Sequence, residues 1–146
     1  MNELVKTTLG AMAPEAVAEI KKFRGRVGEL PGQTDLPIEH HLHAGVYSRT
    51  VFIPKGMLAF GTQIRVPTQM IISGSVVIND GLERREYEGF KVLDGAAGRI
   101  QVAYAREDTY VTMLFATDAK TVREAEDEFT DEAALLQTRK GDVCPE

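Results

Sequence analysis

The stretch from residue 45 to residue 80 limits the fold more than any other part of this chain. It contains three short runs rich in β-branched and aromatic residues, separated by turn-forming Pro and Gly. These runs are 47–53, 57–64 and 70–78. Short strands at this spacing, with turn signals between them, are typical of β-sandwiches and small β-barrels. The stretch therefore predicts an all-β core.

Further strands follow this stretch. Residues 79–82, Asn-Asp-Gly-Leu, indicate a tight turn, and the charge-rich run 83–90 indicates an exposed strand. The last two strands are predicted at 99–105 and 109–116. The run 109–116 is apolar at nearly every position, as is typical of a strand buried on both faces, so we expect it to be central in its sheet.

The flanks of the predicted barrel are different. Pro14 opens an amphipathic helix over 14–23, and the Gly- and Pro-rich residues that follow it indicate an extended arm. After the strands the pattern becomes helical, with Asp118 as the expected N-cap and a second short helix that ends before Gly141. The predicted organisation is a helix and arm over 1–34, a barrel over 35–118 and a helical tail over 119–146.

Composition excludes several classes of protein. The 146 residues fit one domain, and the net charge of −5 argues against nucleic-acid binding, which needs a basic face. No apolar run approaches the length of a membrane span, so no membrane partner is expected. Cys144 is the only cysteine, so no disulfide can form within the chain. We expect a protein made in the cytoplasm of its cell.

All three histidines lie in the tract 39–43, Glu-His-His-Leu-His. In a strand, His41 and His43 point to one side and His40 to the other, so at most two can share a metal ion. A catalytic zinc or iron site uses about three protein ligands. His41 and His43 are thus weak metal candidates, and we favour a structural role for the tract.

Several short motifs together resemble the cupin superfamily, and most closely the small cupin-like proteins of tailed phages and prophages. The motifs are Glu39-His40-His41, Gly45-Val46-Tyr47-Ser48-Arg49, Ile53-Pro54-Lys55-Gly56 and Tyr104-Ala105-Arg106-Glu107-Asp108-Thr109. The resemblance covers roughly residues 35–118. It implies a double-stranded β-helix, or jelly roll, here flanked by an N-terminal helix and arm and by C-terminal helices.

Cupin enzymes hold a metal with two histidines and a glutamate in a first motif and a histidine in a second. In this chain the first-motif window, 60–73, contains no His, Asp, Glu or Cys, and Gln101 stands at the position of the last ligand. The resemblance therefore predicts no metal cofactor in the barrel and no metal-dependent enzyme of the usual cupin type.

The barrel could still bind a small polar or anionic ligand at its mouth. The candidate residues carry hydrogen-bond donors, and they are Gln63, Arg65, Gln69, Gln101 and Tyr104. The alternative is that these are rim residues bonded to one another, and the sequence does not choose between the two.

Three functions remain open at this stage. The first is a non-catalytic structural or interaction protein, and the resemblance implies that it would be a phage virion or assembly component. The second is a small-molecule-binding cupin, and the third is a metalloenzyme with a displaced histidine site at His40, His41 and His43. We also expect a homo-oligomer, because the apolar helix face of Val17, Ile20 and Phe23 needs a surface to cover it.

Overall fold

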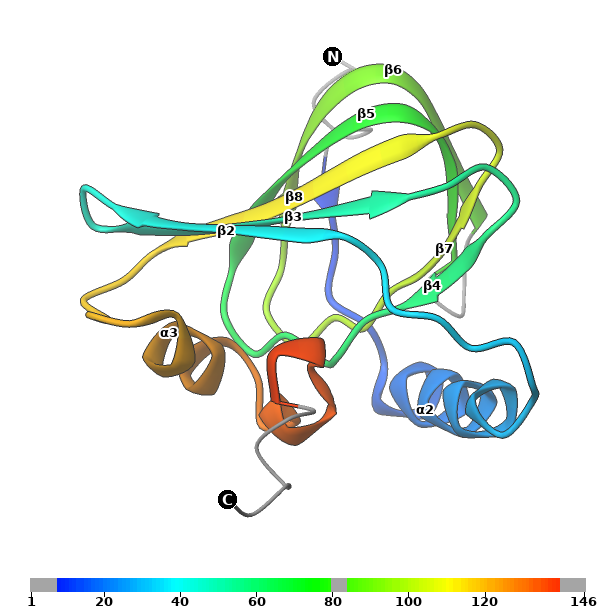
Figure 1. The fold of residues 1–146 in the computed structure, drawn as a ribbon, viewed down its shortest axis with the longest axis horizontal. Helices are drawn as coiled ribbons and strands as arrows, with labels where there is room; N and C mark the ends of the chain where they lie inside the picture. The colour runs from blue at the N-terminus through cyan, green and yellow to red at the C-terminus, as the bar shows by residue number, and fades with distance from the viewer. Residues whose placement is uncertain (1–7, 80–83, 140–146) are drawn as a thin grey trace.

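The computed structural model describes residues 8–79 and 84–139, and its strands form one strongly curved sheet with the helices below it (Figure 1). Cys144, Gly141 and residues 80–82 of the predicted turn lie outside the described residues. The elements in chain order are β1 (Thr8–Leu9), α2 (Pro14–Gly28), β2 (Ile38–His43), β3 (Val46–Ile53), β4 (Leu58–Phe60), β5 (Thr68–Asn79), β6 (Arg84–Gly95), β7 (Val102–Ala105), β8 (Thr109–Ala116), α3 (Val122–Phe129) and the 3₁₀ turns η1 (Ala133–Leu135) and η2 (Gln137–Arg139).

The sheet curls because β5 changes partners along its length. Its first half pairs with β8 and its second half with β7, while β6 runs along its other edge throughout. The strand order is β1-β6-β5-β8-β3-β2, with β7 beside the second half of β5 and β4 beyond β7, and the curved sheet wraps into an open barrel (Figure 1). β8 lies between β5 and β3, which confirms the central position predicted for it.

Gly74 marks the point where β5 leaves β8. Its φ of +147° lies in the region that favours glycine, and a Cβ added there would lie 2.7 Å from both Asp108 O and Thr109 Cα. The fully buried Thr109 side chain occupies this space and accepts a hydrogen bond from the amide of Ser75 at 3.0 Å. Close approach of two backbones at Gly74 therefore makes the bend.

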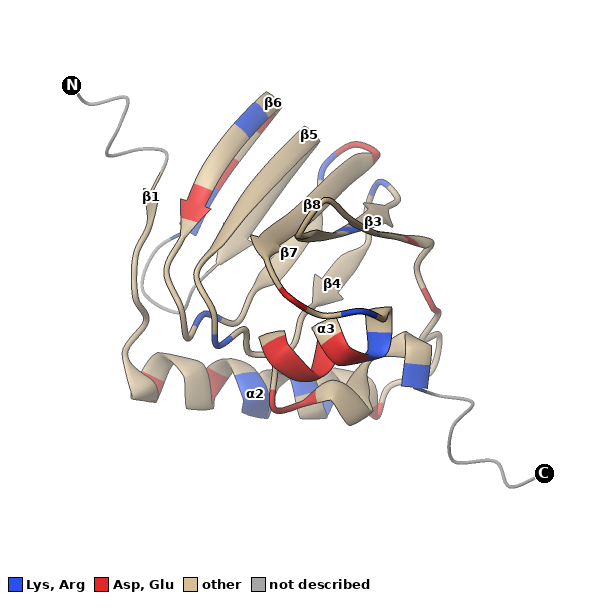
Figure 2. Cartoon of the chain, turned by 90° about the vertical axis from the view of Figure 1, so that its left-hand side faces the viewer, with Lys and Arg blue, Asp and Glu red and all other residues tan. Residues whose placement is uncertain are grey.

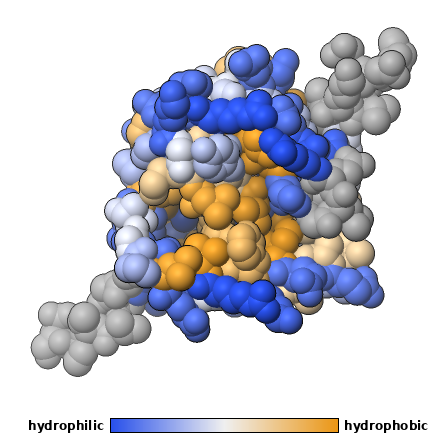
Figure 3. All heavy atoms as spheres, turned by 90° about the vertical axis from the view of Figure 1, so that its right-hand side faces the viewer, coloured by the Kyte–Doolittle hydropathy of each residue, from blue (hydrophilic) through white to orange (hydrophobic). Residues whose placement is uncertain are grey.

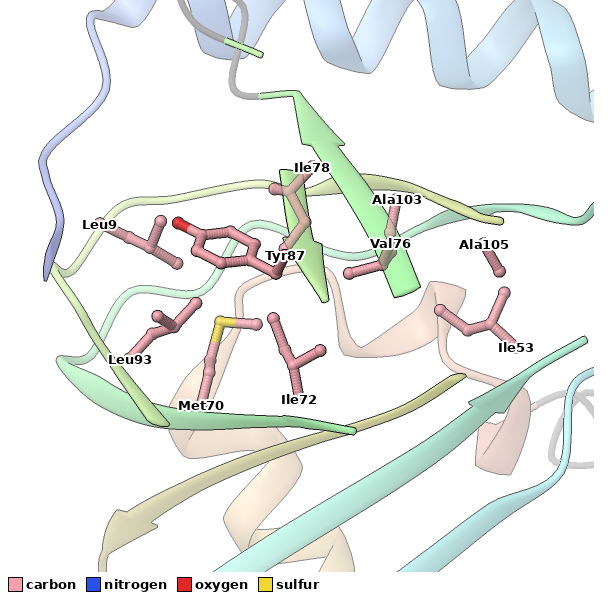
Figure 4. Close-up of a cluster of buried hydrophobic side chains, with 10 residues drawn as sticks. All are labelled: Leu9, Ile53, Met70, Ile72, Val76, Ile78, Tyr87, Leu93, Ala103 and Ala105. Carbon is pink, nitrogen blue, oxygen red and sulfur yellow. The ribbon is translucent and has the colours of Figure 1, made fainter. Parts of the chain in front are cut away.

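The barrel core lies between the inward faces of these strands. Figure 4 shows side chains from β1, β3, β5, β6 and β7 converging on one apolar cluster. The cluster comprises Leu9, Ile53, Met70, Ile72, Val76, Ile78, Tyr87, Leu93, Ala103 and Ala105. On β5, Met70 and Ile72 point inward at the two-residue period of a strand.

The N-terminal helix packs on its own barrel. Val17 and Ile20 are buried against Ile100 and Val102, and Phe23 packs edge-on to Phe60 with ring centroids 5.4 Å apart. The helix is also longer than predicted. Residues 24–28 continue it to Gly28 instead of forming the start of the arm. Val17 and Ile20 are therefore covered within the chain, whereas Phe23 is 46% exposed, and the homo-oligomer stays a prediction.

The C-terminal residues form a compact segment, 122–139, which we call the C-terminal cap. Thr121, not Asp118, is the N-cap of α3, and its hydroxyl accepts a hydrogen bond from the amide of Glu124 at 3.1 Å. Phe129 of this cap packs against Tyr47 and Phe115 of the sheet. The second predicted helix is two 3₁₀ turns, which are too short to carry their own apolar face.

Three strands differ in their boundaries from the sequence prediction, and one of them is β7, which begins at Val102 instead of residue 99. The run 57–64 is a strand only at 58–60, after which the chain touches the sheet again only in an isolated bridge between Ile64 and Arg99. β6 is longer than predicted and continues to Gly95, because β5 pairs with it over its whole length. In the described residues no helix is long and apolar enough to cross a membrane.

Candidate functional site: a cavity inside the barrel

A cavity of about 230 Å³ lies inside the barrel, between the sheet and the C-terminal cap. Most of its wall is apolar side chain from β2, β3, β4, β5, β7, β8 and the cap. The lining residues that argue for a binding site are five polar ones: Arg24, Arg49, Thr62, Gln101 and Gln137. A small number of polar groups in an apolar wall is the usual composition of a small-molecule site.

Two of these polar side chains already form strong hydrogen bonds within the protein. Arg24 donates to both carboxylate oxygens of Glu132, at 3.1 and 2.7 Å, and to the carbonyl of Gly61 at 3.0 Å. Gln137 bonds both ways with the backbone of Leu36, at 2.8 Å in each direction. These contacts hold α2, the segment before β2 and the C-terminal cap together at one side of the cavity.

Arg49 and Gln101 are bound less completely. The Nη1 atom of Arg49 is buried and has no hydrogen-bond partner in the part of the chain that the structure describes. It lies 3.5 Å from Glu126 Oε2, but the same carboxylate accepts hydrogen bonds from Arg139 Nε at 3.0 Å and from the Thr138 hydroxyl. The Gln101 amide donates to Met70 Sδ, and a thioether is a weak acceptor.

The strand register explains why Arg49 faces the cavity. Tyr47, Arg49, Val51 and Ile53 alternate along β3 toward the barrel interior, and Arg49 lies opposite Met113 of β8. Its side chain is 11% exposed, and its guanidinium carbon lies 6.0 Å from the centre of the Phe129 ring. The sequence analysis missed Arg49, although an arginine among inward-facing apolar positions of a strand is a signal that could have found it.

His40 lies opposite Arg49 on the neighbouring strand β2, and its Nδ1 is 2.7 Å from the hydroxyl of Tyr47. Burial, with the positive charge of Arg49, holds the pKa of His40 below its usual 6.5. Burial also raises the pKa of the Tyr47 hydroxyl, so both groups are neutral at pH 7. Arg49 is thus the charged member of this inward-facing group.

The lowered pKa of His40 predicts that the fold loses stability in mild acid. A histidine whose pKa is lower in the folded state binds its proton more tightly when unfolded, so stability is complete above 6.5 and decreases as the pH falls below it. In urea titrations at about pH 7.5 and about pH 5.5, we expect His40→Gln to show a smaller acid-induced loss than the wild type. His41→Gln, on the exposed side of the same strand, is the control and should cost about 1 kcal/mol or less at either pH. Equal acid-induced losses in wild type and His40→Gln would contradict this assignment.

Of the five residues predicted to bind a ligand, the structure brings only Gln101 to the cavity. Gln63 donates from its side chain to the carbonyl of Gly98 at 3.2 Å, and Gln69 donates to Asp94 at 3.3 Å. Arg65 donates to the carbonyls of Asp127 and Glu128 at the end of α3 and pairs with Asp131. These side chains are bonded within the protein, but to other residues and not to one another as the alternative predicts.

Tyr104 lies on β7 and is 43% exposed. Its neighbours in sequence, Ala103 and Ala105, are buried on the opposite side of the strand. The structure therefore places this hydroxyl outside the barrel, away from Gln101.

The histidine tract alternates as predicted. His41 and His43 are exposed on β2, His41 lies 3.4 Å from Glu39, and His40 is partly buried on the other side. Among the described residues there is no group of three His, Cys, Asp or Glu side chains that could hold a metal ion. The cavity lining offers only arginine, amide and hydroxyl groups, a donor set that does not fit the metal of a cupin enzyme.

Glu132 is a charged side chain of the C-terminal cap that bonds to α2 and to the segment after β4. Besides Arg24, it accepts the amide of Gln63 at 2.8 Å and lies 3.8 Å from Lys21 of α2. Figure 2 shows α2 and the cap side by side below the strands. The hydrogen bonds from Arg24, together with the other contacts, hold the pKa of Glu132 below its usual 4.5.

We expect Glu132→Gln to lower the free energy of unfolding by about 2 kcal/mol at neutral pH, because hydrogen bonds to a charged group are lost. A carboxylate with a lowered pKa stabilises the fold above about 4.5 and loses that effect as the pH falls through its folded pKa. The difference from wild type should therefore shrink in acid, as measured by denaturant unfolding. The exposed Glu107, paired with Lys55, gives the control Glu107→Gln, which should change stability by less than about 1 kcal/mol. A constant difference from neutral pH to acid would count against the assignment.

Comparison with known proteins found similar solved structures but no related sequence. No family model and no curated protein matches the sequence. The structure is similar to that of a cupin superfamily protein from Desulfitobacterium hafniense DCB-2, with a TM-score of 0.49 and 13% identity over 61% of this chain and 84% of that one. It is also similar to an RmlC-like cupin family protein with a double-stranded β-helix fold from Methanocaldococcus jannaschii, with a TM-score of 0.47 and 11% identity over 60% of this chain and 85% of that one.

A third similar structure is the cupin-2 domain of an XRE family transcriptional regulator from Enterobacter cloacae, with a TM-score of 0.45 and 13% identity over 56% of this chain and 96% of that domain. At these identities the likeness concerns the fold alone. The all-β part of the predicted fold class is confirmed by the eight-stranded sheet itself.

Proposed function

We propose that this protein is a non-catalytic, cupin-fold binding protein that holds a small molecule inside its barrel. The observation that carries the proposal is the cavity of about 230 Å³, walled mostly by apolar side chains of the sheet and of the C-terminal cap. Protein interiors are close-packed, and a void of this size is unusual in a core that has no ligand to hold.

The size of the cavity limits the ligand. One water molecule in the liquid occupies about 30 Å³, so the cavity has room for roughly seven or eight waters. Drug-sized sites are usually larger. A compact organic molecule with a short apolar body fits the space and the wall.

The lining favours binding over catalysis. Among the described residues that line the cavity there is no His, Cys, Asp or Glu. General acid–base and nucleophilic catalysis most often use these side chains. The groups present there, Thr62, Gln101 and the arginines, can orient a ligand by hydrogen bonds.

Filling the cavity tests the proposal. Ala59 of β4 lines it, so Ala59→Leu places extra carbon atoms in the space with little cost to stability. In an NMR screen with a library of small organic fragments, we expect the wild type to give hits that are lost in Ala59→Leu. The control Ala18→Leu, on the exposed face of α2, should keep them. Absence of hits in the wild type, or hits unaffected by Ala59→Leu, would contradict the proposal.

A second candidate is a structural or interaction protein. Phe90 and Val92 of β6 are 68% and 44% exposed, and among the described residues β6 has β1 on its outer edge only at Asp94 and Gly95. Exposed apolar side chains beside an uncovered strand edge favour contact with another chain. Figure 3 shows hydrophobic atoms between polar ones on the side of the molecule that is on the right in Figure 1.

The finer form of this candidate is a homo-oligomeric component of a phage virion, made in the host cytoplasm. That form is supported by the sequence resemblance alone. Light scattering at tens of micromolar tests it, because an assembly protein of this kind should exceed the mass of one chain. A monomer throughout that range would contradict it.

A further inference from the structure

We propose that the ligand of the barrel cavity is a small organic anion, a monocarboxylate with a short apolar body, whose carboxylate binds Arg49 and Gln101. This inference rests on the proposed function and adds the chemical class of the ligand. It starts from the hydrogen-bonding capacity that the protein leaves unused in the cavity wall.

The unused groups are donors. Arg24 and Gln137 bond strongly to protein acceptors, whereas Arg49 Nη1 has no hydrogen-bond partner among the described residues and the Gln101 amide reaches only a thioether. A buried polar group without a partner costs about 1–3 kcal/mol, and more if it is charged. A ligand that supplies strong acceptor atoms removes this cost.

The balance of charge points in the same direction. The buried carboxylate of Glu126 lies between two arginines, and its hydrogen bonds come from Arg139 and Thr138. Arg49 approaches the same carboxylate only to 3.5 Å and faces the cavity. Arg49 therefore has one ion pair, longer than that between Arg139 and the same carboxylate, in a wall of low polarity where an anion is attracted most strongly.

The residues around Arg49 determine what hydrocarbon part the ligand can have. Met113 lies opposite Arg49 on β8, and Met70 lies opposite Met113 on β5, so the wall beyond the guanidinium is flexible and apolar. Val51, Val111 and Ile64 complete this part of the lining. A carboxylate at Arg49 would thus direct its hydrocarbon part into an apolar space of limited volume.

The test compares an acid with its neutral amide of the same shape. Isothermal titration of the full chain with butanoate, 3-methylbutanoate or benzoate should show binding, and the matching amides should bind about 10- to 100-fold more weakly. Arg49→Met should reduce carboxylate binding by a similar factor, since Glu126 keeps Arg139 and Thr138 in that variant. Arg106→Met, which removes an exposed arginine paired with Glu86, should leave binding unchanged.

The outcomes separate the inference from the proposed function. Amides that bind as tightly as the acids, or acids that bind Arg49→Met as tightly as wild type, would overturn the anion inference. If Ala59→Leu abolishes fragment binding in the same samples, the binding function stands without the anion. If Arg49→Met does not fold, the comparison of acid and amide on the wild type decides, with Arg49→Lys as the variant that keeps the charge.

Discussion

Gly74→Ala is expected to lower the free energy of unfolding by about 4 kcal/mol, the sum of backbone strain and steric overlap at the bend of β5. The alanine Cβ would lie 2.7 Å from Asp108 O and Thr109 Cα, and backbone atoms cannot move aside as the end of a flexible side chain can. Denaturant unfolding followed by circular dichroism measures the change. If the variant is too unstable to purify, we expect its soluble yield at reduced temperature to be lower than that of the wild type.

Gly89 is the matched control for Gly74. It pairs with Gly74 across β5 and β6 and also has a positive φ, +84°, but a Cβ added there meets no atom within 4 Å. Gly89→Ala should therefore cost only the backbone strain, about 1–2 kcal/mol. Equal costs at the two positions would show that close approach of the strands at Gly74 is not what makes the bend.

Glu126→Ala is expected to cost about 3–5 kcal/mol, because it leaves Arg49 and Arg139 buried without their shared carboxylate. The Glu126 side chain is 1% exposed, and its partners come from β3 and from the end of the C-terminal cap. Thermal and denaturant unfolding measure the loss. Asp127→Ala is the control, because Asp127 pairs with Arg139 from an exposed position and should cost about 1 kcal/mol or less.

A double variant that also removes the positive charge of Arg49 tests this prediction further. In the double variant Glu126→Gln with Arg49→Met, part of the lost stability should return, since one buried arginine no longer needs a counter-ion. A double variant that is less stable than Glu126→Gln alone would contradict the view that Arg49 depends on Glu126 for its charge balance.

The barrel strands could be predicted from the sequence because they depend on local patterns. The runs of β-prone residues in β3 and β5, the nearly continuous apolar run of β8 and the turn signals between strands are visible in the chain itself. The partner change of β5 depends instead on a contact between Gly74 and Thr109, residues far apart in sequence. No local pattern encodes such a contact.

The flanking segments were harder to predict. Residues 24–28 carry glycines that favour an arm, but the bonds from Arg24 to Glu132 and to Gly61 are made in the last turns of a helix. The contacts of α2 with its own barrel, through Ile100 and Val102, are also tertiary. Tertiary contacts of this kind override the weak preference of single residues.

The candidate site shows the same limit. Gln101 was found because a cupin motif aligns with it, and it lines the cavity. Arg65 has the chemistry of a ligand-binding residue, but the structure uses it to hold the carbonyls at the end of α3. Arg49 was not recognised in the sequence, because its role in the cavity depends on the neighbouring strands. The strand register that places it opposite Met113 is a tertiary feature that no single segment encodes.

The most direct test of this account is a crystal structure of the full chain with butanoate. We expect the carboxylate inside the barrel, within about 3 Å of Arg49 Nη1 and of the Gln101 amide, with its hydrocarbon part against Met70 and Met113. A carboxylate bound only on the outer surface, or a cavity that stays without ligand when butanoate is present in large excess, would contradict the central claim.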